Sequence, residues 1–202
     1  MRQLIMPPQR PPQRATFTIT YMRMWDYASR NGTNTQLLLR HQPESAWLLL
    51  ASEKAVNKFN LQPMALLSPS HWAGLDPAQM GLGPVHATHA LLKKHKLKFD
   101  DIDYWELNEA FAGQVLACLA AFADANYCKQ ELHARQAWGE IPLEKLNIHG
   151  GAVACGHPVG MTGARIVLHM VHILKQQNAQ RGIATLCIGG GQGGAMMVED
   201  VS

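Results

Sequence analysis

The sequence is poor in charged and aromatic residues, and it has no long hydrophobic run. Of its 202 residues, 47% are hydrophobic, 16% charged and 7% aromatic, a composition typical of a water-soluble globular protein. The longest apolar runs, residues 46–51 and 183–188, fall far short of the roughly 20 residues that a membrane-spanning helix needs. Prolines occupy the N-terminus, where a secretory signal requires apolar residues. We therefore predict a cytoplasmic protein without a membrane span.

Cysteine is also scarce, and its spacing excludes the common cysteine frameworks. The four cysteines are Cys118, Cys128, Cys155 and Cys187. They form no Cys-x-x-Cys pair, and a chain of this size without a secretory signal rarely depends on disulfides. We expect free thiols in a reducing compartment.

Lysine is absent from the first 45 residues, which form a basic arm. Six arginines and two acidic residues give this arm a net charge of +4, whereas the rest of the chain has 12 basic and 13 acidic residues. A basic arm can bind nucleic acid or direct targeting. Here four prolines between residues 7 and 12 break any amphipathic helix, and basic and aromatic residues do not alternate. We predict a non-native or poorly ordered arm and no nucleic-acid partner.

Strand and helix patterns alternate after the arm. Strands are predicted at 46–51, 64–67 and 103–107 and in a hairpin around 189–194, helices at 52–60, 84–92, 111–122 and 161–177, a loop at 76–83 and a polar excursion at 127–144. We expect the strand at 46–51 to be buried, because its residues are apolar throughout. The alternation predicts an α/β fold in which helices cover the faces of a layered mixed β-sheet.

Three polar or glycine-rich turns follow apolar segments: Asn108-Glu-Ala-Phe111, Gly156-His-Pro158 and Cys187-Ile-Gly189. Turns at strand ends are where α/β proteins collect their sites. A histidine near a cysteine suits acyl transfer, because a thiolate needs a base and a thioester needs oxyanion donors. Each turn alone also has a structural interpretation: Asn108 as a helix cap, His157 as a hydrogen-bonding residue and Cys187 as a buried thiol.

Two histidine pairs invite a metal hypothesis. His86 and His89, and likewise His169 and His172, lie three residues apart on predicted helices. Neither pair has a carboxylate or cysteine partner nearby in the sequence, so surface or core histidines are the favoured interpretation. We predict no metal site.

Taken together, the three turns resemble the C-terminal half of the thiolases, the acetyl-CoA acyltransferases and acetyltransferases. The signature turns of that family are Asn-Glu-Ala-Phe, Gly-His-Pro and Cys-x-Gly-Gly-Gly, and all three occur here in the family's order over residues 46–200. The resemblance implies a thiolase C-terminal domain at 62–202, a remnant strand and helix of the N-terminal half at 46–61, and an unrelated arm at 1–45. The long stretch after Asn108 is more similar to the members of fatty acid β-oxidation.

The resemblance also implies a role for each motif residue. His157 takes the proton of the acyl-accepting cysteine and helps to hold an oxyanion. Asn108 fixes a water that shares this oxyanion, and Cys187 exchanges a proton with the substrate α-carbon or the CoA sulfur. The backbone N–H of Gly189 donates to a second oxyanion. Phe111 lines the acyl or pantetheine channel, although a core aromatic is an equally good interpretation. Coenzyme A is then a substrate, and no cofactor is implied.

The chain departs from the family before the strand at 46–51. The nucleophilic cysteine of a thiolase lies in its N-terminal half, and none of the four cysteines here has that setting. The segment Thr33–Ser45 does not match the CoA-binding sequence segment of the family either. We therefore expect a truncated chain with an exposed apolar patch.

Two functions remain open. One is a thiolase half that works with a complementary N-terminal half or as a homo-oligomer, converting 3-ketoacyl-CoA and CoA into acyl-CoA and acetyl-CoA or running the reverse condensation. The other is an inactive relic or interaction module.

Overall fold

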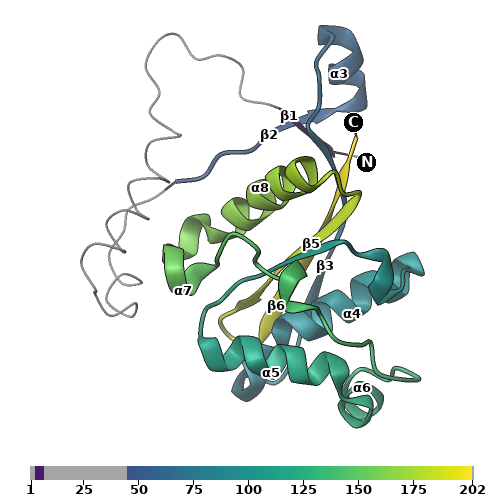
Figure 1. Ribbon diagram of the computed structural model, residues 1–202, viewed down its shortest axis with the longest axis vertical. Coiled ribbons are helices and arrows are strands. Elements are labelled where there is room, and N and C mark those ends of the chain that lie inside the picture. The colour runs from purple at the N-terminus through teal and green to yellow at the C-terminus, as the bar shows by residue number, and fades with distance from the viewer. Residues whose placement is uncertain (1–2, 7–44, 202) are drawn as a thin grey trace.

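The computed structural model describes residues 3–6 and 45–201. Within these residues one six-stranded sheet has the order β2-β1-β3-β6-β5-β4 (Figure 1). The strands are β1 (Gln3–Met6), β2 (Leu49–Ser52), β3 (Ala65–Gly74), β4 (Tyr104–Leu107), β5 (Arg181–Ile188) and β6 (Gln192–Asp200). β4 and β5 pair in parallel, whereas the other neighbours are antiparallel. The predicted α/β fold with a mixed sheet is confirmed.

Helices cover both faces of this sheet (Figure 1). The α-helices are α3 (Glu53–Phe59), α4 (Gly83–His95), α5 (Ala112–Ala123), α6 (Ala125–Glu131), α7 (Ala152–Cys155) and α8 (Val159–Gln177). Short 3₁₀ turns are η1 (Pro77–Leu82), η2 (Phe99–Asp101) and η3 (Leu143–Lys145). α4 and α5 pack in one hydrophobic cluster and α8 in the other.

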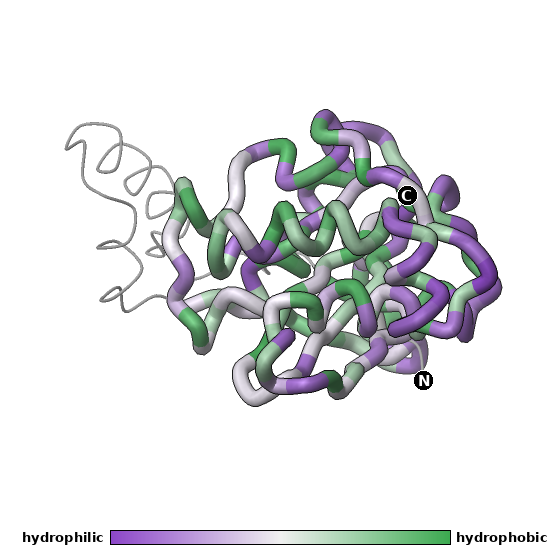
Figure 2. Tube along the Cα trace, turned by 90° about the horizontal axis from the view of Figure 1, so that it is seen from below, coloured by the Kyte–Doolittle hydropathy of each residue, from purple (hydrophilic) through white to green (hydrophobic). Residues whose placement is uncertain are grey.

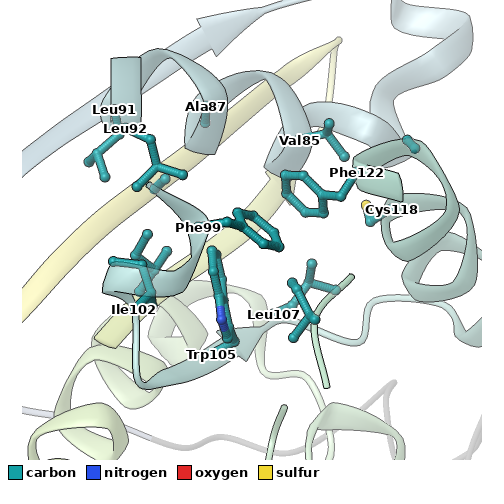
Figure 3. Close-up of a cluster of buried hydrophobic side chains, with 14 of the residues drawn as sticks. Val85, Ala87, Leu91, Leu92, Phe99, Ile102, Trp105, Leu107, Cys118 and Phe122 are labelled. Atoms are coloured by element: carbon teal, nitrogen blue, oxygen red, sulfur yellow. The ribbon is translucent and has the colours of Figure 1, made fainter. Parts of the chain in front are cut away.

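The two clusters lie on opposite faces because side chains alternate along a strand. On β5, Ile183 belongs to the α4 and α5 cluster, whereas Ala184 belongs to the α8 cluster. Three aromatic side chains fill the first cluster (Figure 3): Phe99 lies 4.6 Å from Trp105 and 5.2 Å from Phe122, measured between ring centroids. Hydrophobic and hydrophilic positions alternate around the helical turns of the trace, as expected for helices with one buried face (Figure 2).

Most predicted elements are confirmed. The helix at 52–60 is α3: Ser52 Oγ accepts from the Ala55 N–H at 3.2 Å, and Asn60 ends the helix in the left-handed conformation. The helices at 84–92, 111–122 and 161–177 are α4, α5 and α8. The hairpin around 189–194 joins β5 to β6.

Three expectations are wrong. The apolar run at 46–51 is no buried strand: β2 begins at Leu49, and Leu49 and Leu50 are 52% and 43% exposed because β2 is the end strand of the sheet. The loop at 76–83 is the 3₁₀ turn η1, since the Asp76 carboxylate accepts from the Ala78 N–H at 2.9 Å. The polar excursion overlaps α6, which Asp124 caps.

The arm at 1–45 contributes a strand to the sheet. Its residues 3–6 form β1, so the expectation of poor order is wrong for them. Residues 1–2 and 7–44 lie outside the described residues. The six arginines of the arm are therefore not described, and neither are residues 33–44 of the segment that does not match the thiolase family. The division of the chain at residues 45 and 61 stays a prediction. No described helix is long and apolar enough to cross a membrane.

Candidate active site

Two of the predicted site residues meet in the structure. Asn108 directly follows β4, and His157 lies between α7 and α8. The Nδ2 of Asn108 is 3.4 Å from Nε2 of His157. The backbone N–H of Asn108 donates to the Thr185 carbonyl at 2.9 Å, which fixes Asn108 against β5. Segments 49 residues apart in the sequence thus form one polar cluster at the end of the sheet.

The partners of His157 determine which ring nitrogen carries its proton. The Thr162 hydroxyl donates to the Pro158 carbonyl at 2.9 Å, so its oxygen accepts from Nδ1 of His157 at 2.8 Å. Nε2 then presents its lone pair toward the Asn108 amide. Burial lowers the pKa of His157, and the Arg165 guanidinium lowers it further. His157 is therefore a neutral imidazole that can accept a proton at Nε2.

Asn108 has a side-chain oxygen that is a hydrogen-bond acceptor without a donor among the described residues. Its side chain is 2% exposed, and its Oδ1 accepts no hydrogen bond from the described residues. Buried amide oxygens nearly always have a partner, so such an atom beside a histidine indicates a place for a ligand or a water. The interpretation of Asn108 as a helix cap is wrong, because the cap of α5 is Phe111.

Cys187 lies at the corresponding end of the neighbouring strand. β4 and β5 are parallel, and Leu107 pairs with Thr185. Asn108, just after β4, and Cys187, near the last residue of β5, therefore lie at the same carboxyl end of the two strands. Burial raises the pKa of Cys187. A second thiol, Cys118, lies on α5. Burial raises the pKa of Cys118 to about 12, and the nearby Cys187 thiolate would raise this pKa further. Both thiols stay protonated at neutral pH, so Cys187 is suited to donate a proton.

The glycine turn after Cys187 has different constraints at each position. A Cβ added at Gly189 would meet nothing within 4 Å, whereas one at Gly191 would lie 2.4 Å from the Leu75 carbonyl oxygen. Gly190 and Gly191 have φ of 84° and 82°, which explains glycine there. Packing among the described residues therefore does not require glycine at 189.

Phe111 is 62% exposed at the start of α5, so its interpretation as a core aromatic is wrong. Its role as a channel-lining residue stays a prediction.

Two side chains that no sequence motif indicates join the site segments. The Glu109 carboxylate accepts from the Val153 N–H at 2.9 Å and from Asn147 Nδ2 at 2.8 Å. Asn147 also bonds Leu107 twice, accepting from its N–H at 3.0 Å and donating to its carbonyl at 2.9 Å. Gly151 leaves room for the carboxylate, since its Cβ would lie 2.2 Å from the Glu109 carboxyl carbon. Glu109 and Asn147 thus tie the segment before His157 to the strand before Asn108.

The histidine pairs have partners from distant elements. Nδ1 of His169 is 3.0 Å from Oε1 of Glu106, and Nε2 of His169 is 3.0 Å from Nδ1 of His149. His169 therefore has a carboxylate partner that is distant in the sequence, because Glu106 comes from β4. Within the described residues, no group of three or more His, Cys, Asp or Glu side chains is arranged to hold a metal ion.

Comparison with known proteins identifies the family to which this arrangement belongs. The family model described as "Thiolase, C-terminal domain" matches residues 61–200. The chain belongs to the thiolase family. It is 44% identical over 157 residues to the beta-ketoadipyl-CoA thiolase of Pseudomonas aeruginosa, and 39% identical over 155 residues to the acetyl-CoA acetyltransferase of Syntrophomonas wolfei. These alignments cover 78% and 77% of this thiolase chain and 35% of each relative.

Solved thiolase structures are similar as well. The acetyl-CoA acetyltransferase of Bacillus anthracis superposes with a TM-score of 0.64 at 39% identity, covering 76% of this chain and 35% of that one. Human mitochondrial 3-ketoacyl-CoA thiolase, determined in complex with CoA, superposes with a TM-score of 0.66 at 28% identity, covering 93% of this chain and 54% of that one. The chain thus spans about a third of the length of the curated relatives described above.

Proposed function

We propose that this chain supplies the C-terminal part of a thiolase-type acyltransferase site, which a complementary N-terminal half completes. The reaction converts 3-ketoacyl-CoA and CoA into acyl-CoA and acetyl-CoA, or runs in reverse as a Claisen condensation. The contact between Asn108 and His157 carries the proposal, because Thr162 fixes the ring of His157 with its basic nitrogen toward Asn108. The family membership agrees with it.

The protons balance over two half-reactions. Nε2 of His157 takes the proton of the nucleophilic cysteine on the complementary half, and the thiolate attacks the 3-keto carbonyl. The bond between the α and β carbons breaks, and the Cys187 thiol protonates the α-carbon to give acetyl-CoA. The Cys187 thiolate then takes the proton of the incoming CoA, whose sulfur attacks the acyl-cysteine. The cysteine leaves and regains its proton from His157.

The remaining groups stabilise charge and place the substrate. Asn108 holds a water beside His157 at the first oxyanion, and its spare Oδ1 supports this role. The N–H of Gly189 donates to the second oxyanion, where the space around its α-carbon admits a thioester. Exposed Phe111 contacts the acyl or pantetheine chain. Coenzyme A enters as a substrate, and the free thiol of Cys187 fits the reducing cytoplasm, where we place the protein.

A complementation assay tests the proposal. The chain is co-expressed with the N-terminal half of the Pseudomonas aeruginosa thiolase, and cleavage of acetoacetyl-CoA by CoA is followed by absorbance. We expect turnover with both halves and none with either alone. His157→Gln lowers the rate by about 10²-fold or more, because it removes the base. The His71→Gln variant is the matched control, because His71 lies on β3, which β6 separates from β5 and β4 in the sheet.

The opposite result is also informative. If the bacterial N-terminal half is active with its own C-terminal half but not with this chain, the inactive relic or interaction module becomes the better description. Turnover that His157→Gln leaves unchanged contradicts the proposed base.

A further inference from the structure

Strand β1 fills a slot between two strands that come much later in the sequence. Gln3–Met6 pairs with Ser52–Leu49 on one side, and Gln3–Ile5 pairs with Leu67–Ala65 on the other. Both pairings are antiparallel, so β1 has a hydrogen-bonded neighbour along each edge. Without β1, β2 and the first half of β3 would face each other across an empty strand position.

One side chain anchors β1 in the core. Ile5 is 1% exposed and belongs to the α8 cluster, together with Ala65, Leu67 and Val198. The Ile5 carbonyl also accepts from the Met64 N–H at 2.6 Å. Burying an isoleucine side chain contributes free energy that the backbone ladder alone does not supply. An occupant of the slot therefore needs an extended backbone and an apolar residue at the position of Ile5.

No tight turn holds β1 in place. Residues 7–48 separate it from β2, whereas a hairpin that fixes two strands has a loop of about 2–5 residues. The match to the thiolase C-terminal domain begins at residue 61, so β1 lies outside the matched residues and yet pairs with β3, the first strand within them. Among the described residues, β2, β3 and the α8 cluster supply the contacts of β1.

We propose that the slot between β2 and β3 is a strand-acceptor site for an extended apolar peptide, and that the chain's own residues 3–6 are its detachable occupant. The covalent link through residues 7–48 raises the local concentration of the strand at the slot. The family domain thereby binds a peptide by strand addition, a mode in which backbone hydrogen bonds give affinity and one pocket gives specificity.

A fluorescent peptide of residues 1–9 and a chain lacking residues 1–6 test this proposal by fluorescence anisotropy. We expect the peptide to bind the shortened chain at least about tenfold more tightly than the full chain, where the tethered strand competes. The Ile5→Asp peptide loses binding, and the matched Ile5→Val peptide keeps it. Equal binding to both chains, or equal binding of the Asp and Val peptides, overturns the proposal.

Hydrogen exchange on the full chain decides the matter if the shortened chain does not fold. Ile5→Asp detaches β1, so amides of residues 49–52 and 65–67 exchange faster while those of β5 keep their protection. Unchanged exchange at residues 65–67 overturns the proposal, and so does a uniform increase over the whole sheet.

Discussion

At the scale of single residues, one asparagine does more for the site than its motif position indicates. Asn147 makes three side-chain hydrogen bonds, two to Leu107 and one to Glu109, and its φ of 45° is a conformation that asparagine tolerates. The Asn147 side chain thus satisfies both backbone groups of Leu107, the last residue of β4, as a neighbouring strand would. The geometry of Asn108 thus depends on a residue with no expected part in the chemistry.

Asn147→Asp should destabilise the chain by about 2–4 kcal/mol. The substitution preserves the shape and the acceptor for the Leu107 N–H, but it places an oxygen against the Leu107 carbonyl and the Glu109 carboxylate. Urea unfolding followed by circular dichroism measures the change. The control is Asn57→Asp at an exposed position of α3, and an equal effect of the two substitutions contradicts the role given to Asn147.

Acid should destabilise the chain through its histidines. Burial lowers the pKa of His86, His89, His157 and His172 below the ordinary value of 6.5. The unfolded chain then binds protons more readily, so the stabilisation is complete above about pH 6.5 and is lost as the pH falls below it. We expect a lower urea midpoint at about pH 5.5 than at about pH 7.5.

The variant His172→Gln tests the assignment, because it removes one of the four groups and should weaken the dependence on pH. A midpoint that rises on acidification contradicts the prediction.

The sequence predicts some of these residues and not others for a physical reason. Asn108 and His157 follow strand or turn signals in short motifs, and the structure brings them together. The bonds of Glu109 to Val153 and Asn147 span 44 and 38 residues. No local pattern encodes such bonds, because they depend on how distant loops pack.

At the scale of elements, two glycines bring α4 against β6. A Cβ on Gly193 would lie 2.0 Å from the Gly83 carbonyl oxygen, and one on Gly83 would lie 2.8 Å from the Gly193 α-carbon. The atoms in contact belong to the two backbones, so no side-chain rotation could relieve a clash with an added Cβ. The start of α4 is therefore fixed to the strand that follows the glycine turn of the site.

Gly193→Ala should destabilise the chain by about 3 kcal/mol or more, since the added methyl group forces α4 away from the sheet. Thermal unfolding by calorimetry measures the loss. Gly74→Ala on β3 is the matched control, because a Cβ there meets nothing within 4 Å. Equal changes for the two variants would show that the close approach does not matter.

The sequence predicts whether a segment is a strand or a helix better than it predicts how exposed that segment is. An apolar run such as 46–51 indicates a strand, yet the position of that strand in the sheet decides whether it is buried. β2 lies at the end because β1 separates it from β3, and residues 3–6 are too few to show a clear strand pattern in the sequence.

At the scale of the whole molecule, α5 presents a face without charge to solvent. None of its 12 residues is charged, although a surface helix usually has a polar side. The exposed positions are Ala112, Gly113, Leu116, Ala117, Ala120 and Ala123. This face begins at Phe111, beside the proposed site, and it agrees with the exposed apolar patch expected of a thiolase half.

We expect the chain to self-associate reversibly through this face. Leu116 is 67% exposed and is the largest exposed side chain of α5 itself, so Leu116→Glu should shift the equilibrium toward the monomer. Sedimentation velocity over a range of concentrations measures this shift. Leu143→Glu is the control, because Leu143 is similarly exposed, at 74%, but belongs to η3 and not to α5. A chain that stays monomeric at every concentration contradicts the expectation.

The pairing of β3 with β6 has a consequence for synthesis on the ribosome. Ala65 pairs with Asp200 and Gly74 with Gln192, so β3 emerges more than a hundred residues before its partner. At about 5–20 residues per second, the nascent strand waits roughly 6–25 s. β1 and β2 have already been translated by then, and β1 can shield the first half of β3 from other nascent chains.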